Sequence, residues 1–383
     1  MSKQTSNKVD KKAEKSPSPE TRLPVVILWV PDLLNAFRVK EASEALQSLK
    51  LPALQTLLAK ADRFPLKRQD EDEQASYLFH QPKNLPKAAV MASVEIKEYD
   101  DSLFWLRVDP VQMIADRDSL VLIPATDIGI TEKESKALLN VFNEHFSQDQ
   151  VELEYASATA WYLKIKQPVD IQTHSLASVA YQPVNERYPS GNAASYWRQL
   201  LNETQMLFYA APVNERRREQ GIPEINSVWM WGEGRLNPSV IVTREAATVW
   251  SENNYLMGLA KIAKAGQKPS PINYQAWWDA LQAMSATASV DDTSKSLNAQ
   301  HHLIRLDTVS DSLPSMQQSD WLAALEALEQ QWLVPLEHAL KKKELGSVLL
   351  DFGGGYRYHL KPAHLRRFWR FKKSLICLSE PET

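Results

Sequence analysis

Pro24-Val-Val-Ile-Leu-Trp-Val30 is the stretch that decides the fold, because it is an unbroken apolar run bounded by Pro24 and Pro31. A strand with one face in water alternates apolar and polar residues, and this run contains no polar residue. The pattern is typical of a strand buried on both faces, as in a mainly parallel sheet. Such sheets carry helices on both faces, so the run predicts an α/β protein.

Downstream of this strand, helical and strand patterns alternate along the chain. The stretch 51–61 is expected to form a helix with Pro52 at its start, and Thr131 with Glu134 forms a capping box for a helix ending near Phe146. The periodic stretch 320–342 contains Pro335, which should kink or divide a long helix. Further helices are expected at 41–49, 73–80, 192–209, 255–265 and 274–284, and further strands at 103–108, 119–123, 161–165, 225–231, 240–243, 302–306, 347–352 and 356–360.

The order strand, strand, helix, strand between 103 and 165 suggests a small α/β domain inserted into the main one. We therefore expect an inserted domain at 94–183 and an α/β core made of 23–93 and 184–383. The first 22 residues are rich in Lys, Ser, Pro and Glu and are expected to form a disordered tail.

The composition is that of an ordinary soluble globular protein, with 44% hydrophobic and 24% charged residues in 383. The single cysteine, Cys377, excludes an internal disulfide and a cysteine-based zinc cluster. The apolar run near the N-terminus is too short to span a bilayer, and the residues before it lack the apolar core of a signal peptide. We therefore expect a cytoplasmic protein with no membrane partner.

Charge is unevenly distributed, although the formal net charge is only −3. Residues 341–373 contain ten Lys or Arg and two acids, and 1–22 carry +3, which leaves −14 on the rest of the chain. The basic segment interleaves aromatic residues with Arg357, Arg366, Arg367 and Arg370, a composition that suits single-stranded nucleic acid. The alternative is that the aromatic residues pack and the charges are solvated, and the acidic remainder opposes nucleic-acid binding.

The most specific motif is Ala211-Pro-Val-Asn-Glu-Arg-Arg-Arg-Glu-Gln-Gly-Ile-Pro-Glu-Ile-Asn-Ser-Val-Trp-Met-Trp-Gly-Glu-Gly234. It resembles a segment of the archaeal-type cofactor-independent phosphoglycerate mutases. The residues that keep the family's order and spacing are Pro212, Val213, Asn214, Arg217, Gly221, Pro223, Asn226, Gly232 and Gly234. Weaker similarity covers 51–60 and 76–80, and the length and tryptophan content look closest to a proteobacterial set of related proteins described as regulatory.

The resemblance implies an alkaline-phosphatase-like core, with a mainly parallel sheet, helices on both faces and a small inserted α/β domain. It also implies ligand-binding roles for Asn214, Arg217 and Asn226. Each has a structural alternative: the asparagines can tie loops to backbone groups, and Arg217 can belong to a charged helix face.

The catalytic residues that the resemblance would supply are missing. The family uses a serine nucleophile and two metal ions, yet its glycine-rich ligand turn reads Pro31-Asp32-Leu33-Leu34 here. The nucleophile loop falls at Gln69-Asp70-Glu71, with no serine within five residues of Asp70. The family's Asp-Pro-His has become Thr173-His174-Ser175, its His-Arg pair Trp161-Tyr162, and the histidine before Pro-Val-Asn is Ala211. We therefore expect no catalytic residue.

These losses predict a non-catalytic, phosphoglycerate-mutase-like protein with a binding or regulatory role and no cofactor. Its expected partner is a protein or a small phosphorylated ligand. The competing hypothesis is a mutase or phosphatase that has rebuilt a manganese or zinc site. Its residual metal ligands would be Asp32, His174, His301, His302 and Asp307, since carboxylate and imidazole groups are ordinary ligands of such ions.

Overall fold

The computed structural model describes residues 23–31, 33–36, 49–66, 75, 79, 85–149, 151–237, 246–287, 301–307, 318–353 and 355–375. The segment 1–22, the expected helix 41–49, the expected strand 240–243 and most of the expected helix 73–80 lie outside these residues. Among the described residues, no helix is both long and apolar enough to cross a membrane.

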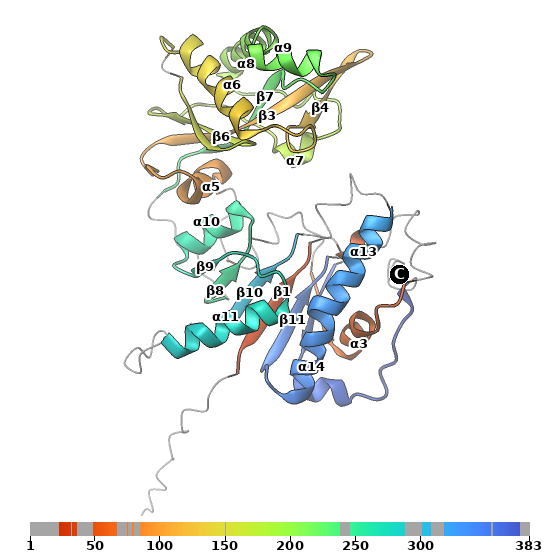
Figure 1. Cartoon of the computed structure of the whole chain (residues 1–383). Coiled ribbons are helices and arrows are strands. Elements are labelled where there is room, and N and C mark those ends of the chain that lie inside the picture. The colour runs from red at the N-terminus through yellow and green to blue at the C-terminus, as the bar shows by residue number, and fades with distance from the viewer. Residues whose placement is uncertain are drawn as a thin grey trace, which may run out of the picture.

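A seven-stranded sheet forms the centre of the larger lobe (Figure 1). Its middle strand is β1 (Val25–Trp29), which runs parallel to β10 (His301–Arg305) on one side and β11 (Ser347–Asp351) on the other. Outside β10 lie β8 (Thr248–Trp250) and β9 (Gly266–Lys268), also parallel. Outside β11 lie the antiparallel strands β12 (Tyr356–Leu360) and β2 (Asp62–Pro65). The sheet is thus mainly parallel, as the sequence predicted.

Strand β1 is buried on both faces, which confirms the prediction made from its apolar run. Val26 and Leu28 point to one face of the sheet, and Ile27 and Trp29 point to the other. Successive residues of a strand face opposite sides, so alternate side chains of β1 are buried on each face of the sheet. A polar residue anywhere in this run would lie in one of the two hydrophobic layers.

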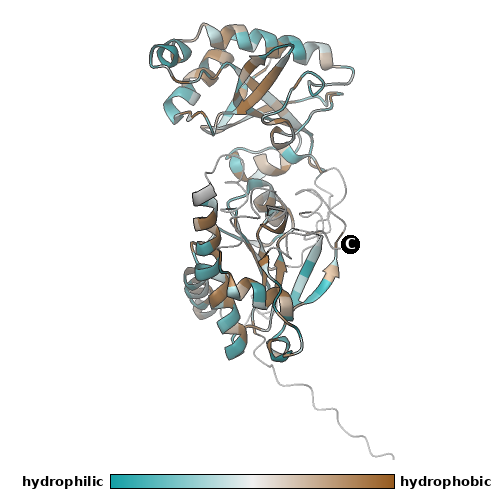
Figure 2. Ribbon diagram, turned by 90° about the vertical axis from the view of Figure 1, so that its right-hand side faces the viewer, coloured by the Kyte–Doolittle hydropathy of each residue, from teal (hydrophilic) through white to brown (hydrophobic). Residues whose placement is uncertain are grey.

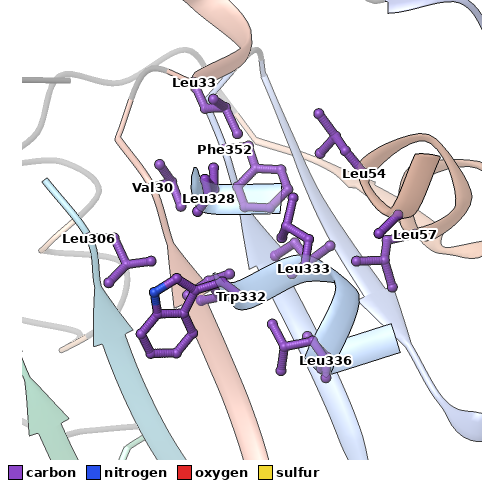
Figure 3. Packing of buried hydrophobic residues seen from close by; sticks show 14 of the residues in the cluster. Val30, Leu33, Leu54, Leu57, Leu306, Leu328, Trp332, Leu333, Leu336 and Phe352 are labelled. Atoms are coloured by element: carbon purple, nitrogen blue, oxygen red, sulfur yellow. The ribbon is translucent and has the colours of Figure 1, made fainter. Parts of the chain in front are cut away.

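Helices cover each face of this sheet. One face packs against α3 (Pro52–Lys60), α11 (Tyr274–Thr287), α13 (Gln318–Leu328) and α14 (Val334–Lys342), with Trp332, Leu333 and Leu336 over the sheet (Figure 3). The other face packs against α5 (Lys87–Glu95) and α10 (Asn254–Ile262). The short helix α1 (Leu33–Ala36) follows β1. Figure 2 shows the apolar strands inside and polar helix surfaces outside.

The long helix predicted at 320–342 is divided, as expected from its proline. A π-helical turn, Glu329–Leu333, separates α13 from α14, and Pro335 lies in the first turn of α14. The turn places Glu329, which is fully buried, against the start of α3. Its carboxylate accepts hydrogen bonds from the backbone N–H groups of Ala53 (2.5 Å) and Leu54 (3.0 Å). These are among the helix N–H groups that have no partner inside the helix, so Glu329 caps α3, and burial raises its pKa.

The second lobe is built on a smaller antiparallel sheet. Its strands are β3 (Phe104–Asp116), β4 (Ser119–Pro124), β6 (Ala160–Ile165) and β5 (Leu153–Ser157), and β7 (Ser227–Gly234) also pairs with β3. Helices α6 (Glu132–His145), α8 (Ala194–Tyr209) and α9 (Pro212–Glu219) cover one face, and α7 (Leu176–Val179) lies on the other side with β4 (Figure 1).

Strand β7 belongs to the second sheet, although it lies beyond the expected inserted domain at 94–183. In the structure its backbone pairs with β3 from Val111↔Ser227 to Trp105↔Gly234. Helices α8 and α9 precede it in the chain and pack on the same second sheet. The long β3 pairs with β4 and β6 along different parts of its length, so a further strand can join the sheet from much later in the sequence.

The helix predicted to begin at Thr131 is confirmed in detail. The Thr131 side chain accepts from the Glu134 backbone N–H, and the Glu134 carboxylate accepts from the Thr131 N–H at 2.9 Å. The predicted hairpin of 347–352 and 356–360 is also confirmed, with Val348 opposite Leu360. Helix α5 and strand β5 were not predicted.

Candidate functional site

A cleft of about 1500 Å³ lies at the carboxyl edge of the parallel sheet. Arg305 ends β10, and Leu306 and Asp307 follow it into the cleft, while Glu252 and Asn253 follow β8. Because β8 and β10 are parallel, their carboxyl ends meet at one edge, which is where open α/β sheets bind ligands. The opposite wall comes from α5 and the second sheet, through Lys87, Arg107 and Trp231 among others.

Three cationic side chains line this cleft. Arg305 stacks on Trp29, with its guanidinium carbon 4.6 Å from the ring centroid, and its Nε donates to Asp307 at 2.6 Å. The Lys87 ammonium lies 6.0 Å from the centroid of Trp231. The ion pair and the ring contact hold Arg305 in place, whereas Lys87 is only near the Trp231 ring.

Arg107 is the third cation and is held by buried carboxylates. Its Nε donates to Asp109 at 2.7 Å, and its Nη1 donates to Glu95 and to the Tyr162 hydroxyl, each at 2.8 Å. Burial opposes the charged form, but the carboxylates of Asp109 and Glu95 outweigh it and raise the pKa of Arg107. Burial also raises the pKa of Tyr162, so the phenol stays neutral beside a permanent cation.

The remaining wall of the cleft is apolar. It is formed by α13 and the π-helical turn, which present Ala323, Ala324, Ala327, Leu328 and Trp332. The cleft therefore combines three cationic side chains with a hydrophobic surface on α13, although Arg305 and Arg107 are paired with carboxylates and the carboxylates of Glu252 and Asp307 also line it. Such a combination suits an anionic compound that also has an apolar part.

The segment Thr173-His174-Ser175, which replaces the family's Asp-Pro-His, lies beside this cleft. Its polar groups form hydrogen bonds with other groups of the protein. The Thr173 backbone N–H and hydroxyl both donate to the Glu233 carboxylate, and the Thr173 hydroxyl oxygen accepts from the Gly232 N–H at 3.1 Å. The Trp229 indole N–H donates to the carbonyl of His174 at 2.8 Å. Protein groups thus hold this segment in place.

The Gly232-x-Gly234 turn lets β7 approach the start of α5. Gly232 has φ +75° and Gly234 has φ +145°. A Cβ on Gly234 would lie 2.5 Å from Cβ of Pro86, and one on Gly232 would lie 3.0 Å from the backbone nitrogen of Ala88. The motif therefore fixes Lys87 and α5 at the cleft through close packing.

Two other positions where the resemblance expects ligands are occupied by core residues. Trp161 and Tyr162 are buried, and the Trp161 indole N–H donates to the Ser135 hydroxyl at 2.9 Å. Ala211, which replaces the histidine before Pro-Val-Asn, is buried ahead of the first turn of α9. These side chains carry no group suited to binding a divalent metal.

The residual metal candidates do not come together among the described residues. His301 and His302 begin β10, whereas Asp307 follows its end, and a strand rises about 3.3 Å per residue, so they lie roughly 15–20 Å apart. His302 is buried against Trp250 and Trp277. His174 precedes Ser175, which lines the cleft, and Asp32 lies outside the described residues. In the described part of the chain, no group of three His, Cys, Asp or Glu could hold a metal ion.

Asn214 and Asn226, expected to bind a ligand, bond to the backbone of the protein. The buried Asn214 amide donates to the carbonyls of Phe208 and Ile225, each at 2.8 Å, and accepts from the Ile225 N–H at 2.9 Å. Asn226 accepts from the Met113 N–H at 2.7 Å and donates to its carbonyl at 2.9 Å. This geometry favours the structural alternative, in which both asparagines tie loops to neighbouring strands.

Arg217 is also engaged with the protein and is only 1% exposed. Its Nε donates to the carbonyl of Pro223 at 2.6 Å, its Nη2 to the carbonyl of Ile128 at 2.6 Å and its Nη1 to Glu134 at 2.9 Å. All three nitrogens have partners, and the side chain joins α9 to the start of α6. The alternative that Arg217 belongs to a charged, solvated helix face does not hold, because the guanidinium is buried.

The four arginines proposed for nucleic acid are in different environments. Arg357 is buried on β12, with its Nε 3.7 Å from a carboxylate oxygen of Asp351. Arg367 binds Asp62 through two nitrogens, at 2.6 and 3.1 Å, and Arg370 contacts the same carboxylate at 3.2 Å. Arg366 is exposed. Three of the four are therefore paired with carboxylates instead of forming one exposed basic groove.

Asp62 should make the segment 367–373 sensitive to acid. The hydrogen bond from Arg367, with further charge from His364 and Arg370, lowers its pKa to about 2, against roughly 3.9 in an unfolded chain. A lowered pKa stabilises the fold above the unfolded value, so this contribution is complete above about pH 4 and is lost as the pH falls through about 2. We expect amide protection of 367–373 to fall over that range.

Asp62→Asn should show the same loss of protection at neutral pH. Asp279→Asn is the matched control, because Asp279 is exposed on α11 and accepts a hydrogen bond from Gln275 of the same helix. Unchanged protection of 367–373 in Asp62→Asn would contradict the assignment.

Sequence reasoning did not identify the cations of the cleft. The clearest signal was at Arg305, which lies near the carboxyl end of the predicted strand 302–306, with Asp307 directly after it. Lys87 and Arg107 gave no such signal, because they reach the cleft only through packing between α5, β7 and the larger sheet.

A mainly parallel sheet with helices on both faces, a smaller second sheet and a cleft at the carboxyl edge define a mixed α/β protein with two lobes. Its homologues are cofactor-independent phosphoglycerate mutases, which confirms the resemblance found in the sequence. The chain is 20% identical over 229 residues to the 2,3-bisphosphoglycerate-independent phosphoglycerate mutase of Methanosarcina barkeri, covering 55% of each protein.

A second relative is the probable 2,3-bisphosphoglycerate-independent phosphoglycerate mutase of Geobacter sulfurreducens. It is 24% identical over 154 residues, which cover 39% of this chain and 37% of that protein. The chain thus matches about half of the first relative's length and less of the second's. No protein-family model matches the sequence.

One solved structure supports the same fold at low sequence identity. The PH0037 protein of Pyrococcus horikoshii aligns with a TM-score of 0.50 and 11% identity, over 88% of this chain and 87% of that one. The cofactor-independent phosphoglycerate mutase of Thermoplasma acidophilum aligns with a TM-score of 0.46 and 11% identity, over 94% and 96%.

Proposed function

We propose that the chain is a non-catalytic relative of the phosphoglycerate mutases that binds a small phosphorylated ligand in a regulatory role. One observation carries the proposal. Lys87, Arg107 and Arg305 line the cleft at the sheet edge, while Trp161 and Ala211 occupy positions where the resemblance expects metal ligands. Cationic side chains attract a phosphate group, and a phosphoryl transfer of the family's kind needs in addition the nucleophile and the metals.

The described residues do not fit the two metal ions that the resemblance implies. Trp161, Tyr162 and Ala211 are buried in the core or at a helix start, and Thr173 is bonded to Glu233. The proposal therefore includes no step through a metal. The enzyme alternative would have to build its site around Asp32, with His174 and Asp307 as the candidates nearest the cleft.

Binding without turnover is the expected result for the purified protein. Titration with 3-phosphoglycerate or inorganic phosphate should give saturable heat, and Lys87→Gln should weaken binding about fivefold or more, since it removes one positive charge. Lys361→Gln is the matched control, because Lys361 is exposed beyond β12. Phosphoglycerate and generic phosphate esters, with Mn²⁺ or Zn²⁺ added, should not be turned over.

Metal-dependent turnover that Asp32→Ala abolishes would refute the non-catalytic part of the proposal. Absence of any saturable anion binding would refute the proposal that the cleft binds a small phosphorylated ligand. Metal analysis of protein purified without chelators separates the two, because a rebuilt enzyme site would retain an ion.

A further inference from the structure

Three large aromatic side chains near the C-terminus point into solvent. Phe368 is 82% exposed, Trp369 60% and Phe371 83%. The rings of Phe368 and Trp369 meet edge to face, with centroids 5.1 Å apart. Single exposed apolar residues are ordinary, but a contiguous exposed group marks an interaction site. We call residues 367–373 the aromatic loop.

The aromatic loop is anchored by its own basic side chains, which turn inward. Arg367 and Arg370 bind Asp62 and the carbonyl groups of Lys60 and Ala61 at the end of α3. In return, the Lys60 ammonium donates to the carbonyls of Arg367 and Arg370, each at 2.6 Å. In Figure 1 this last segment runs beside α3.

The far end of the loop is anchored as well. The Lys372 ammonium donates to the carbonyl of Pro52 at 3.2 Å, and the Gln55 amide donates to the carbonyl of Lys373 at 2.8 Å. The loop backbone is thus fixed along its whole length, and the aromatic side chains are exposed because of that fixed conformation. A preformed surface loses little conformational entropy when it binds.

Positive charge surrounds the aromatic side chains. Lys361, Arg366, Lys372 and Lys373 are exposed around them. The stretch 361–373 contains six Lys or Arg and no acid, and Asp62 is the carboxylate bound to it. The remainder of the chain is acidic, so this surface is the place where an anionic partner would be attracted.

We propose that the aromatic loop docks on an anionic lipid surface. Phe368, Trp369 and Phe371 would enter the interfacial region of the bilayer, and Lys361, Arg366 and Lys373 would lie over acidic headgroups. Aromatic side chains and Lys or Arg are the residues by which proteins lie on membranes. Each basic residue close to an anionic leaflet adds attraction.

The size of the apolar group favours a lipid surface over a protein. Three aromatic side chains together bury roughly 450–750 Å², somewhat less than the roughly 800 Å² that each partner contributes to a stable protein interface. A protein would have to use the charged surface around the loop for the rest. A bilayer needs only the protruding side chains and the nearby cations.

The orientation of the arginines argues against nucleic acid. A strand bound along the loop would need cations directed outward at its phosphates, yet Arg367 and Arg370 are directed inward to Asp62. The expectation of no membrane partner was based on the lack of a spanning segment. Docking on a surface requires no span.

Vesicle co-sedimentation of the full chain tests the proposal. We expect binding to phosphatidylcholine vesicles that contain phosphatidylglycerol, little binding to phosphatidylcholine alone, and weaker binding at higher salt. The triple variant Phe368→Ser/Trp369→Ser/Phe371→Ser should lower partitioning at least about tenfold. The matched control Met206→Ser/Tyr209→Ser/Ile272→Ser, which removes apolar side chains exposed elsewhere, should bind as the unchanged protein does.

Circular dichroism and thermal melting establish that both variants fold. A second variant, Lys361→Gln/Arg366→Gln, should keep the fold and lose binding to the anionic vesicles. The proposal is overturned if no vesicle binds, if the aromatic variant binds as well as its control, or if only labelled single-stranded RNA or DNA is bound.

Discussion

Arg217→Ala is expected to lower the free energy of unfolding by about 3 kcal/mol, the lower end of the usual cost of removing one partner of a buried ion pair, because the Glu134 carboxylate is 20% exposed. The side chain is almost fully buried and bonds to Glu134 and to the carbonyls of Pro223 and Ile128. Alanine would leave these acceptors without their donor inside the protein. Urea unfolding of the second sheet, followed by circular dichroism, measures the change.

Two further variants make the Arg217 experiment specific. Arg217→Lys should recover only part of the loss, because an ammonium cannot reproduce the planar guanidinium fork that reaches three separate acceptors. Arg216→Ala is the matched control, since Arg216 is the exposed neighbour on α9, and it should change stability by less than about 0.5 kcal/mol. A loss below about 1 kcal/mol in Arg217→Ala would show that this buried network does not stabilise the fold.

Gly258→Ala is the second substitution with a large expected effect. A Cβ at Gly258 would lie 2.3 Å from the carbonyl oxygen of Val90 and 2.7 Å from its Cγ1. Helices α10 and α5 therefore cross in direct backbone contact, and a methyl group must force them apart. Overpacking of this kind lowers the free energy of unfolding by about 1–3 kcal/mol and occasionally more. We expect a loss near the upper end of this range, because the new methyl group would clash with backbone atoms.

Gly266→Ala is the matched control for Gly258→Ala. Its Cβ would meet the Thr248 side chain at 3.3 Å, and a side chain can move where a helix backbone cannot. Since Lys87 and Met91 of α5 and Tyr255 of α10 line the cleft, Gly258→Ala should also weaken the anion binding expected there. Equal melting temperatures for the two variants would contradict the close helix contact.

Local sequence patterns predicted the elements that depend on few neighbours. The apolar run of β1 identified a strand buried on both faces, because its composition alone excludes a solvent face. The capping box at Thr131 and the division of the helix near Pro335 followed from hydrogen bonding and from proline geometry. Each of these signals lies within a few residues of the structure that it specifies.

Features that depend on long-range packing were not predicted. The pairing of β7 with β3 joins Ser227 to Val111, and no local pattern indicates which sheet a buried strand will enter. The sequence suggested ligand roles for Asn214 and Arg217, but Asn214 bonds to the backbone of Phe208 and Ile225, and Arg217 reaches the distant Ile128. Conversely, Lys87 and Arg107 became candidates only when their positions in the cleft were known.

The order of strands in the larger sheet has a consequence for how the chain folds during synthesis. Val25 of β1 pairs with His301 and Ser347, so the central strand stays without partners until most of the chain has been made. The smaller sheet, by contrast, finds all its partners between Phe104 and Gly234. Contacts that are distant in sequence form slowly, and domains fold as units as they emerge. The second lobe can therefore complete its fold first. Until β10 and β11 have been made, the apolar β1 has no partner strands and needs protection from aggregation.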